Sequence, residues 1–589
     1  MYRPPLGDIK FVLEHIVDLE ALTELPAYDH VDVDTVNGVL DEAGRFMSEV
    51  VAPTNRIGDT QGSVRNDDGT VTVPEEFAKA YQQYVAAGWN GIKGDPAYGG
   101  HGFPGVIGLA VQEMLTTTNM AFSLCPMLTM STIVALTNHG TEEQKADYLE
   151  HLISGEWSGT MVLTEPEAGS DIGALRTKAV PADDGTWRIT GTKIFITWGD
   201  HDMAENIVHL VLARAPGAPP GTKGISLFIV PKYLLDDRGR PGEPNGVSCV
   251  SIEHKLGIHG SPTCVMSFDD AVGSLVGEVH EGMRAMFTMM NDARLHVGLE
   301  GLGITERAYQ HSVAHAAQRT QGRAIGSPPG TSSPIIEHPD VRRMLLTMKA
   351  NAEAMRGLLY DTARAIDLSH HHPDESTRAH WRDRADLLTP VAKAWCTDLG
   401  VEMASLGVQI HGGMGYVEET GAAQYYRDAR IAPIYEGTNG IQAIDLVMRK
   451  LPMAGGGVVR TYLAELASVC IDLAAAGPGL ESVRRELEEG VDLLRNATEW
   501  LLAQSDPNDV LAAATPYLRL FGIVAGGAYL ARQARAAVDG AEDDDFLAAK
   551  VATTRFYAEQ LLPQAFGLVP AATAHASALF AVTTEMLGA

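Results

Sequence analysis

The order of helix-like and strand-like segments is what most constrains the fold of this chain. Within residues 159–277, short runs rich in β-branched residues are separated by Gly, Pro and Asp. Such runs are typical of an all-β module, and here they are 160–164, 187–190, 193–197, 207–213 and 225–230. On both sides of the module, apolar residues recur at helical spacing. The sequence therefore predicts a mostly helical α+β protein with a β module between two helical parts.

At 589 residues the chain is too long for one compact core, so we expect several domains. A glycine-rich stretch at 452–457 is read as a linker before a last part rich in Ala and Leu. The expected division is a lead segment (1–30), an N-terminal helical domain (31–158), a β domain (159–277), a helical bundle (278–452) and an additional C-terminal helical domain (453–589).

Charge and cysteine usage limit the partners and the compartment. The formal net charge is −30, which argues against a nucleic-acid or anionic-membrane surface. The five cysteines are widely spaced without a zinc-binding pattern, which indicates free thiols in a reducing compartment. The N-terminal residues show no apolar signal region, and no uninterrupted apolar run reaches the ~20 residues that span a bilayer. We therefore expect a cytoplasmic protein without membrane insertion.

Among the acidic residues, Glu436 has the most unusual surroundings. It follows the apolar residues 431–435 and precedes Gly437, and helical spacing resumes at Ile441. The pattern predicts a loop that enters a helix, with Glu436 on the loop. On such a loop, desolvation raises the pKa of a carboxylate towards neutrality, where a catalytic base works best. The local sequence also fits a surface glutamate near the start of a helix, favoured by the helix dipole.

Three other motifs are read as structural. The glycine-rich loop at 95–104 lacks the Lys-Ser/Thr ending of a phosphate loop, and the glycines at 298–303 do not follow a strand as a dinucleotide fingerprint requires. The adjacent His370, His371 and His372 could bind a metal, but adjacent positions do not converge on one helix face. We therefore predict a solvated loop there and no metal site.

Six motifs give the chain a resemblance to a known family. In chain order they are 140–145 (GTEEQK), 161–171 (MVLTEPEAGSD), 195–197 (FIT), 318–323 (QRTQGR), 409–415 (QIHGGMG) and 435–442 (YEGTNGIQ), preceded by Arg427-Asp428-Ala429. In this order they resemble the acyl-CoA dehydrogenases. The resemblance implies an N-terminal helical domain, a central β-barrel and a C-terminal helical bundle. The extra C-terminal segment resembles the long bacterial branch, which includes dehydrogenases of broad-range fatty acyl-CoAs and of 3-methylthiopropanoyl-CoA.

The implied activity is that of an oxidoreductase acting on CH–CH bonds, as in fatty acid β-oxidation and lipid metabolism. An FAD-dependent α,β-dehydrogenation would convert an acyl-CoA thioester to trans-2-enoyl-CoA, with Glu436 as base and hydride transfer to flavin N5. Some family members carry the base on the long helix instead, but the matching position here is Ala293. Two alternatives remain open: an acyl-CoA oxidase, and a non-catalytic DNA-associated flavoprotein of the same fold.

The resemblance also assigns binding residues. For FAD they are Leu163, Thr164, Gly169, Ser170, Phe195, Thr197, Arg319, Gln321, Gln409, Gly412, Gly413 and Thr438. For the acyl-CoA they are Ser170, Asn291, Arg294 and Gly437; for Arg294 a surface ion pair on the helix is the alternative. By resemblance, Arg319 and the loop at 409–413 serve the FAD of a neighbouring subunit. We therefore expect a homodimer, with a tetramer as the other possibility, and an electron-transfer flavoprotein as the electron acceptor.

Overall fold

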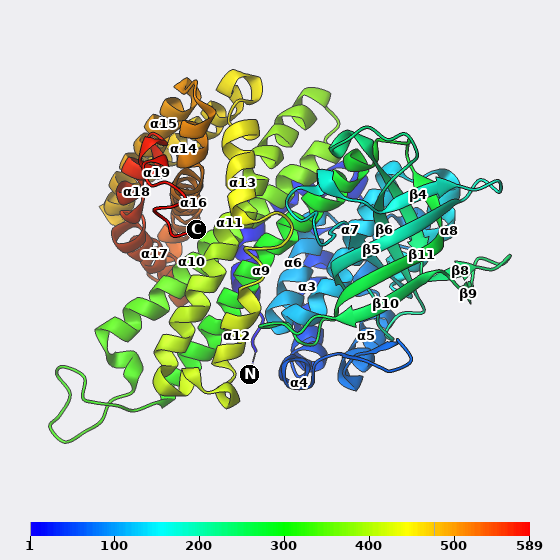
Figure 1. The fold of residues 1–589 in the computed structure, drawn as a ribbon. Helices are drawn as coiled ribbons and strands as arrows, with labels where there is room; N and C mark the ends of the chain where they lie inside the picture. Colours follow the sequence, from blue (N-terminus) through cyan, green and yellow to red (C-terminus); the bar gives the residue numbers. More distant parts are fainter. Residues whose placement is uncertain (1, 476–477) are drawn as a thin grey trace. The chain divides into compact units, whose positions relative to one another are not determined.

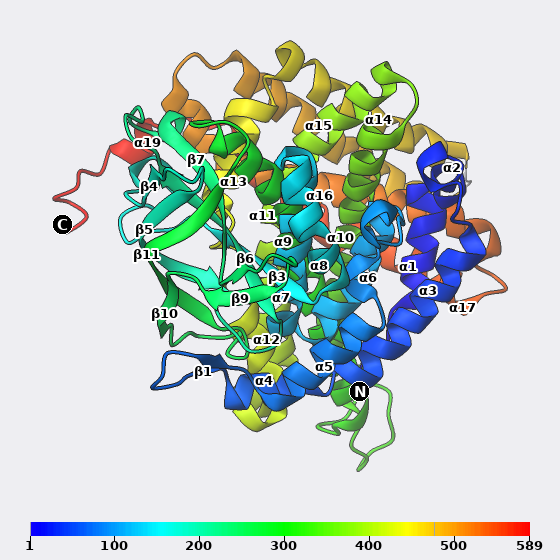
Figure 2. The same ribbon diagram turned by 90° about the vertical axis from the view of Figure 1, so that its right-hand side faces the viewer.

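The computed structural model describes residues 2–475 and 478–589, and they divide into two compact units. The mixed unit comprises Glu42–His296 and contains both helices and strands. The helical unit comprises the residues up to Asp41 together with Val297–Ala589. Helices α3 (Val33–Phe46) and α9 (Gly282–Gln318) each run from one unit into the other. Figures 1 and 2 show the ribbon from two directions.

In the mixed unit, the main sheet closes on itself. Its pairings run β11–β5–β4–β6, and β7 pairs with both β6 and β11, so that these five strands form a ring. Strand β10 extends the ring at β11, and β3 pairs in parallel with β6. The strands are β3 (Trp157–Val162), β4 (Lys178–Pro181), β5 (Trp187–Thr197), β6 (Asn206–Arg214), β7 (Ile225–Pro231), β10 (Val247–Ile252) and β11 (Thr263–Val276). The expected central β-barrel is thereby confirmed.

Because side chains alternate between the two faces of a strand, one set of apolar residues from each barrel strand forms the core. Ile189, Val211, Phe228, Met266 and Phe268 belong to one buried apolar cluster, contributed by four strands. The runs predicted separately at 187–190 and 193–197 form the single strand β5, in which the intervening Gly191 sits opposite Phe268. Two short hairpins lie outside this sheet, formed by β1 (Val64–Arg65) with β2 (Val71–Thr72) and by β8 (Tyr233–Leu235) with β9 (Pro241–Pro244).

The rest of the mixed unit is mainly helical. Its helices are α4 (Thr54–Gln61), α5 (Glu75–Ala86), α6 (Gly105–Thr118), α7 (Met120–His139) and α8 (Glu142–Ser154). Helix α7 lies directly on β3 (Figure 2). A Cβ on Gly159 of β3 would stand 2.3 Å from Thr132 Oγ1, and the Gly159 N–H donates to Thr129 Oγ1 at 3.0 Å. Glycine at this position therefore permits the close approach of helix and strand.

The motif at 140–145 has a structural role at the start of α8. Thr141 and Gln144 form a reciprocal capping box, in which each side chain bonds the other residue's backbone N–H. The Gln144 amide also donates to Ser274 Oγ at 3.1 Å and to the Leu275 carbonyl at 2.8 Å. The motif thus ties the first turn of α8 to the last residues of the barrel strand β11.

Two long antiparallel helices, α10 (Pro339–His371) and α11 (Glu375–His411), form the centre of the helical unit (Figure 1). The predicted loop at 370–372 is wrong for its first two residues: His370 and His371 belong to the last turn of α10, which the His372 N–H closes by donating to the Leu368 carbonyl. Asp374 then caps α11 by accepting the Thr377 N–H at 2.7 Å. Within the described residues, no group of three or more His, Cys, Asp or Glu side chains could hold a metal ion. The other helices of this unit are α1 (Leu6–Val12), α2 (Leu19–Thr23), α12 (Ala422–Ala429), α13 (Asn439–Asp445), α14 (Gly457–Ala475), α15 (Glu481–Ala503), α16 (Pro507–Ala537), α17 (Asp545–Phe556), α18 (Gln564–Ala572) and α19 (Ser577–Phe580).

By length and composition, α7 and the segment Pro507–Gly540 could each cross a membrane, although most of each is buried within the protein.

The last helices pack directly on α11. Trp395 of α11 lies against α16, where Cβ atoms on Gly522 and Gly526 would stand 2.3 Å and 2.6 Å from the indole ring. These two glycines on one helix face form the groove that accepts the ring. The C-terminal helices therefore pack against α11 and do not form a separate unit.

The N-terminal helix α1 joins the same unit through a buried ion network. Lys550 of α17 is buried and pairs with Asp8 of α1 and with Glu353 of α10, the latter at 3.1 Å. Although burial by itself raises the pKa of Asp8, the Lys550 ammonium and other cations lower it to about 2. A buried ion pair is costly to break because the remaining charge is left unpaired. Lys550 thus links the beginning, the middle and the end of the chain.

Replacing Lys550 should weaken this link. We expect Lys550→Met to destabilise the protein by about 3 kcal/mol, because the partly buried Asp8 loses its bonded cation and the buried Glu353 retains only Lys349 among the described residues. Chemical denaturation followed by circular dichroism measures the change. The matched control is Arg495→Met, which removes an exposed pair with Asp492 and should barely move the midpoint. Equal midpoints for Lys550→Met and the wild type would contradict this account of the network.

Candidate active site

Glu436 lies on a tight loop between α12 and α13, as the sequence predicts. Its backbone is left-handed, with φ 56°, and Gly437 follows with φ 84°. Thr438 then caps α13 by accepting the Ile441 N–H at 3.3 Å. A left-handed non-glycine residue costs of the order of 1–3 kcal/mol and persists where the surroundings enforce it, often at functional sites. The backbone therefore holds Glu436 in a conformation that a free loop would avoid.

Buried polar groups enforce this turn. Lys393 of α11 is fully buried, and its ammonium donates to the Gly437 carbonyl at 3.0 Å and to Asn439 Oδ1 at 2.8 Å. The amide of Gln442 donates to the carbonyls of Glu436 and Gly437 at 3.2 Å and 3.3 Å. The Asn439 amide in turn donates to Asp398 Oδ1 at 2.7 Å. The Gly437 carbonyl is thus held by two donors and the Glu436 carbonyl by one, which preorganises the loop.

Sequence reasoning missed these supporting residues. Lys393 stands alone in an otherwise apolar helical run at 391–396. A charged residue at a buried helical position is uncommon and needs a partner. That was the available signal, but the partner lies far away in sequence and only the fold identifies it.

In the mixed unit, the structure brings two of the six motifs together. The loop after β3 carries Leu163 and Thr164, and β5 carries residues 193–197. Lys193 donates from its ammonium to the Leu163 carbonyl at 2.8 Å, and the Ile194 N–H donates to the Thr164 carbonyl at 2.9 Å. The residues predicted to face a flavin therefore lie on adjoining segments.

A buried ion pair fixes the same loop. Glu165 lies 2.8 Å from Lys193 and also accepts the Thr177 N–H at 3.0 Å and the Thr177 hydroxyl at 2.6 Å. Burial lowers the pKa of Lys193 to about 8, while Glu165 acts in the opposite direction. Burial also raises the pKa of Glu165, but its cationic and hydrogen-bond donors outweigh this and the net direction is downward. The pKa of Lys193 falls despite its partner because the ammonium is wholly removed from water.

Phe195 is presented by a β-bulge. The pairing of β5 with β11 moves from Ile196↔Cys264 to Lys193↔Met266, so that β5 has one extra residue. Phe195 occupies this bulge with φ 59°, and 58% of its side chain is exposed. An exposed aromatic ring on a strained strand residue offers a flat apolar wall. Thr197, two residues further along β5, is partly buried.

The turn after Thr164 leaves space for a ligand. Gly169 and Ser170 are both exposed, and a Cβ on Gly169 would meet no atom within 4 Å. The Ile194 N–H bonds the Thr164 carbonyl, so Phe195 lies close along the chain to the segment that leads into this turn. The residues therefore fit a planar aromatic group with a polar extension.

On α9, the two predicted substrate residues face each other across one helical turn. Arg294 donates to Asn291 Oδ1 at 3.1 Å, and only 5% of Arg294 is exposed, so it is not a surface residue of the helix. Ala293 between them is buried. Asp292, which the sequence did not single out, accepts from Lys93 Nζ at 2.9 Å and from Ser131 Oγ at 2.8 Å. Burial raises the pKa of Asp292, but Lys93, His296 and the Ser131 hydroxyl together outweigh it and lower the pKa to about 2.

The remaining predicted cofactor residues lie at the ends of α9 and α11. Arg319 and Gln321 follow α9 and are exposed, with the Arg319 guanidinium donating to Gln321 Oε1 at 3.3 Å. Gln409, Gly412 and Gly413 are exposed at the end of α11. The two helix ends adjoin, because the rings of His315 and His411 stack at 4.3 Å. The structure thus gathers these residues into one exposed region of the helical unit.

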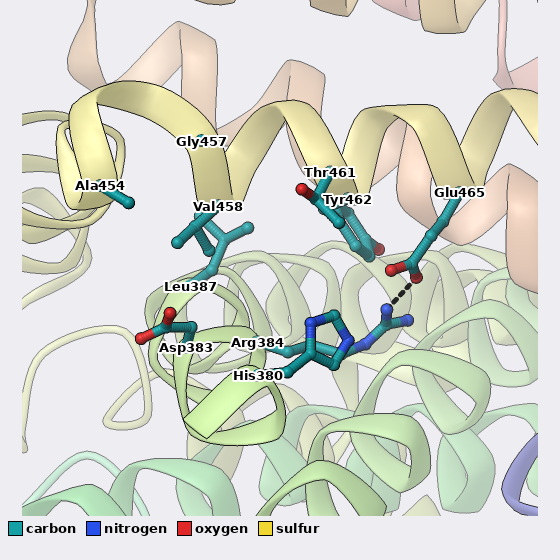
Figure 3. Close-up of a pocket in the computed structure, with 10 residues that line it drawn as sticks. All are labelled: His380, Asp383, Arg384, Leu387, Ala454, Gly457, Val458, Thr461, Tyr462 and Glu465. Carbon is teal, nitrogen blue, oxygen red and sulfur yellow. Dashed lines mark hydrogen bonds and ion pairs between the residues drawn. The ribbon is translucent and has the colours of Figure 1, made fainter. Parts of the chain in front are cut away.

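A cavity of about 250 Å³ lies elsewhere in the helical unit, lined by residues of α11, α14 and the turn between α13 and α14 (Figure 3). Its lining contains none of the predicted site residues. Arg384 at its edge already pairs with Asp361 at 2.7 Å and with Glu465, as the dashed line in Figure 3 marks. We therefore assign this cavity to the packing of α14 on α11.

The comparison with family models covers most of the chain. The N-terminal domain of acyl-CoA dehydrogenases matches residues 35–156, the middle domain 160–271 and the C-terminal domain 280–451. A further model, acetyl-CoA dehydrogenase C-terminal like, matches residues 462–583.

Sequence comparison with individual proteins leads to the same family. The chain is 47% identical to 3-methylmercaptopropionyl-CoA dehydrogenase of Ruegeria pomeroyi, over 95% of this chain and 96% of the relative. It is 36% identical to a broad-specificity linear acyl-CoA dehydrogenase of Mycobacterium tuberculosis, again over 95% and 96% of the two chains.

A solved structure shows the same fold over nearly the whole length. It is that of an acyl-CoA dehydrogenase from Bacillus anthracis complexed with FAD, and its TM-score is 0.72 at 21% identity, covering 98% of this chain and 94% of that one. The family models, the relatives and this fold lead to one conclusion: the chain belongs to the acyl-CoA dehydrogenase family.

Proposed function

We propose that the protein catalyses the α,β-dehydrogenation of an acyl-CoA thioester with FAD as cofactor and Glu436 as the base. The observation that carries the proposal is the conformation of Glu436: a carboxylate held on a strained turn by buried donors, in a member of this family. A catalytic base needs such fixed placement because proton transfer requires hydrogen-bond reach in a defined geometry.

In the proposed reaction the Glu436 carboxylate removes the proton from the carbon next to the thioester carbonyl. Negative charge then builds on the thioester oxygen, and the backbone N–H of Glu436 stabilises it, which is the logic of an oxyanion hole. When bound, FAD supplies the acceptor for the hydride that leaves the neighbouring carbon. The product is a trans-2-enoyl-CoA.

The mixed unit would hold the cofactor. Phe195 provides the aromatic wall and Thr197 a hydroxyl donor, while the backbone of Leu163 and Thr164 faces the ring. The open turn at Gly169 and Ser170 accommodates the pyrophosphate, because Gly169 has room on its Cβ side. The exposed region with Arg319, Gln321, Gln409, Gly412 and Gly413 serves FAD of a second subunit, and Thr438 also contacts FAD. Asn291, Arg294, Ser170 and Gly437 contact the acyl-CoA.

For the substrate and partners, the proposal follows the relatives. The 47% identity to 3-methylmercaptopropionyl-CoA dehydrogenase supports a short or thioether-containing acyl chain over a long one. We further propose a cytoplasmic homodimer that passes its electrons to an electron-transfer flavoprotein.

The domain boundaries at 30, 158, 277 and 452 also stay a prediction.

Glu436→Gln tests the base. We expect the rate of anaerobic flavin bleaching by an acyl-CoA panel that includes 3-methylmercaptopropionyl-CoA to fall by at least ~100-fold, because an amide cannot accept the proton. Stopped-flow absorbance measures the rate, and the flavin content shows that FAD is still bound. The control is Glu489→Gln, the same change at an exposed position of α15, which should bleach as the wild type does. Bleaching that survives in Glu436→Gln would reject the assignment.

Phe195→Ala tests the cofactor wall. We expect FAD to dissociate about tenfold more readily, because stacking on an aromatic ring contributes of the order of 1 kcal/mol. Equilibrium dialysis with flavin fluorescence gives the affinity. Val250→Ala, which shortens another exposed apolar side chain of the same unit, serves as control. Unchanged FAD affinity in Phe195→Ala would place the flavin elsewhere.

A further inference from the structure

A buried carboxyl lies behind the loop of the proposed base and has no part in the reaction as stated above. Glu300 is on α9, and only 1% of it is exposed. Its Oε2 accepts the hydroxyl of Tyr435 at 2.5 Å, and Tyr435 directly precedes Glu436 in the chain. The Tyr435 side chain thus connects the interior of the helical unit to the strained turn.

The surroundings of Glu300 favour its neutral form. Its other oxygen, Oε1, is buried and makes no hydrogen bond to any described residue. An ionised carboxylate in such a place would lack the donors that compensate for lost hydration. Burial raises the pKa of Glu300 to about 8; the Tyr435 hydroxyl and the Lys393 ammonium act against this rise, and the charge of Glu436 adds to it. At neutral pH the Glu300 carboxyl therefore carries a proton.

Three titratable groups act on Glu300 among the described residues: Tyr435, Lys393 and Glu436. Tyr435 and Glu436 belong to the turn, and the Lys393 ammonium bonds the Gly437 carbonyl of the same turn. Glu300 is therefore coupled to Glu436 both through the Tyr435 hydrogen bond and through its charge. The same packing could be achieved with an apolar residue at lower cost, so the carboxyl needs another explanation.

We propose that Glu300 is a positioning residue for Glu436: its neutral carboxyl anchors Tyr435 and thereby the turn, and its ionisation slows the dehydrogenation. The proposal rests on the proposed function, because Glu436 must be the base. Once ionised, Glu300 repels the Glu436 carboxylate, and this repulsion displaces the base from the geometry that proton transfer requires. Glu300 makes the enzyme sensitive to pH in the mildly alkaline range.

The test uses the FAD-loaded protein and an acyl-CoA that bleaches it anaerobically, with the bleaching rate measured by stopped flow from neutral to alkaline pH. The wild type should lose rate in a step near pH 8. Glu300→Gln should remove this step and stay within about threefold of the wild type at neutral pH, since the amide oxygen still accepts the Tyr435 hydroxyl but cannot ionise.

Tyr435→Phe provides the second arm. It removes a donor that favours the ionised form of Glu300, so the step should move to higher pH. It also releases the turn, and we expect the neutral-pH rate to fall about tenfold, in line with the loss of one buried hydrogen bond. Asp398→Asn is the matched control. It changes a carboxyl that contacts the same loop through Asn439, and it should leave the step in place.

A readout independent of turnover completes the test. A folded-state pKa near 8 means that, between about pH 4.5 and pH 8, the folded protein keeps a proton that the unfolded chain releases, so stability falls as pH rises through this window. Glu300→Gln removes this loss. Its melting temperature should therefore gain on the wild type at pH 8 relative to pH 5, with and without FAD.

The outcomes separate the two proposals. A step near pH 8 that persists in Glu300→Gln, a rate that rises instead of falling across the step, or a melting difference independent of pH would overturn the role of Glu300. Bleaching that survives in Glu436→Gln would overturn the proposed base, whereas the melting result does not depend on that assignment.

Discussion

The conformation of the loop that carries the proposed base depends on the buried ammonium of Lys393. It bonds the Gly437 carbonyl and the Asn439 side chain, at the point where two successive residues have left-handed backbones. A turn of this kind is unfavourable for Glu436, and it is retained because its carbonyls are satisfied from α11 and from Gln442. The backbone conformation at the proposed base is therefore stabilised by a side chain more than forty residues away.

In the mixed unit, a buried lysine likewise holds the backbone of a loop. Lys193, buried in β5, bonds the Leu163 carbonyl and pairs with Glu165, and so fixes the loop that follows β3. In each unit a lysine on a regular element holds the backbone of a loop to which the proposed chemistry is assigned. Regular elements thus position the loops. The hydrogen bonds of a buried charge are directional, so they fix the loop backbone more precisely than apolar packing alone.

The C-terminal helices extend this support. Trp395 lies two residues after Lys393 on α11 and rests in the groove formed by Gly522 and Gly526 of α16. The same part of the chain is tied to α1 and α10 through Lys550. The additional helices therefore act on the proposed site by fixing α11, the helix that holds the loop, and they need not contact the substrate to matter for the reaction.

Much of this protein could be read from its sequence. Periodicity and turn residues predicted the helix–strand–helix order and the loop at Glu436, because these depend on local propensity and on which face is buried. Gly437 and the bulged Phe195 were singled out because they stand in motifs. Tertiary structure alone decided the roles of Lys193, Glu300 and Lys393. Each is a charged residue at a buried position, and its function lies in a partner distant in sequence, which only the folded chain brings within hydrogen-bond distance.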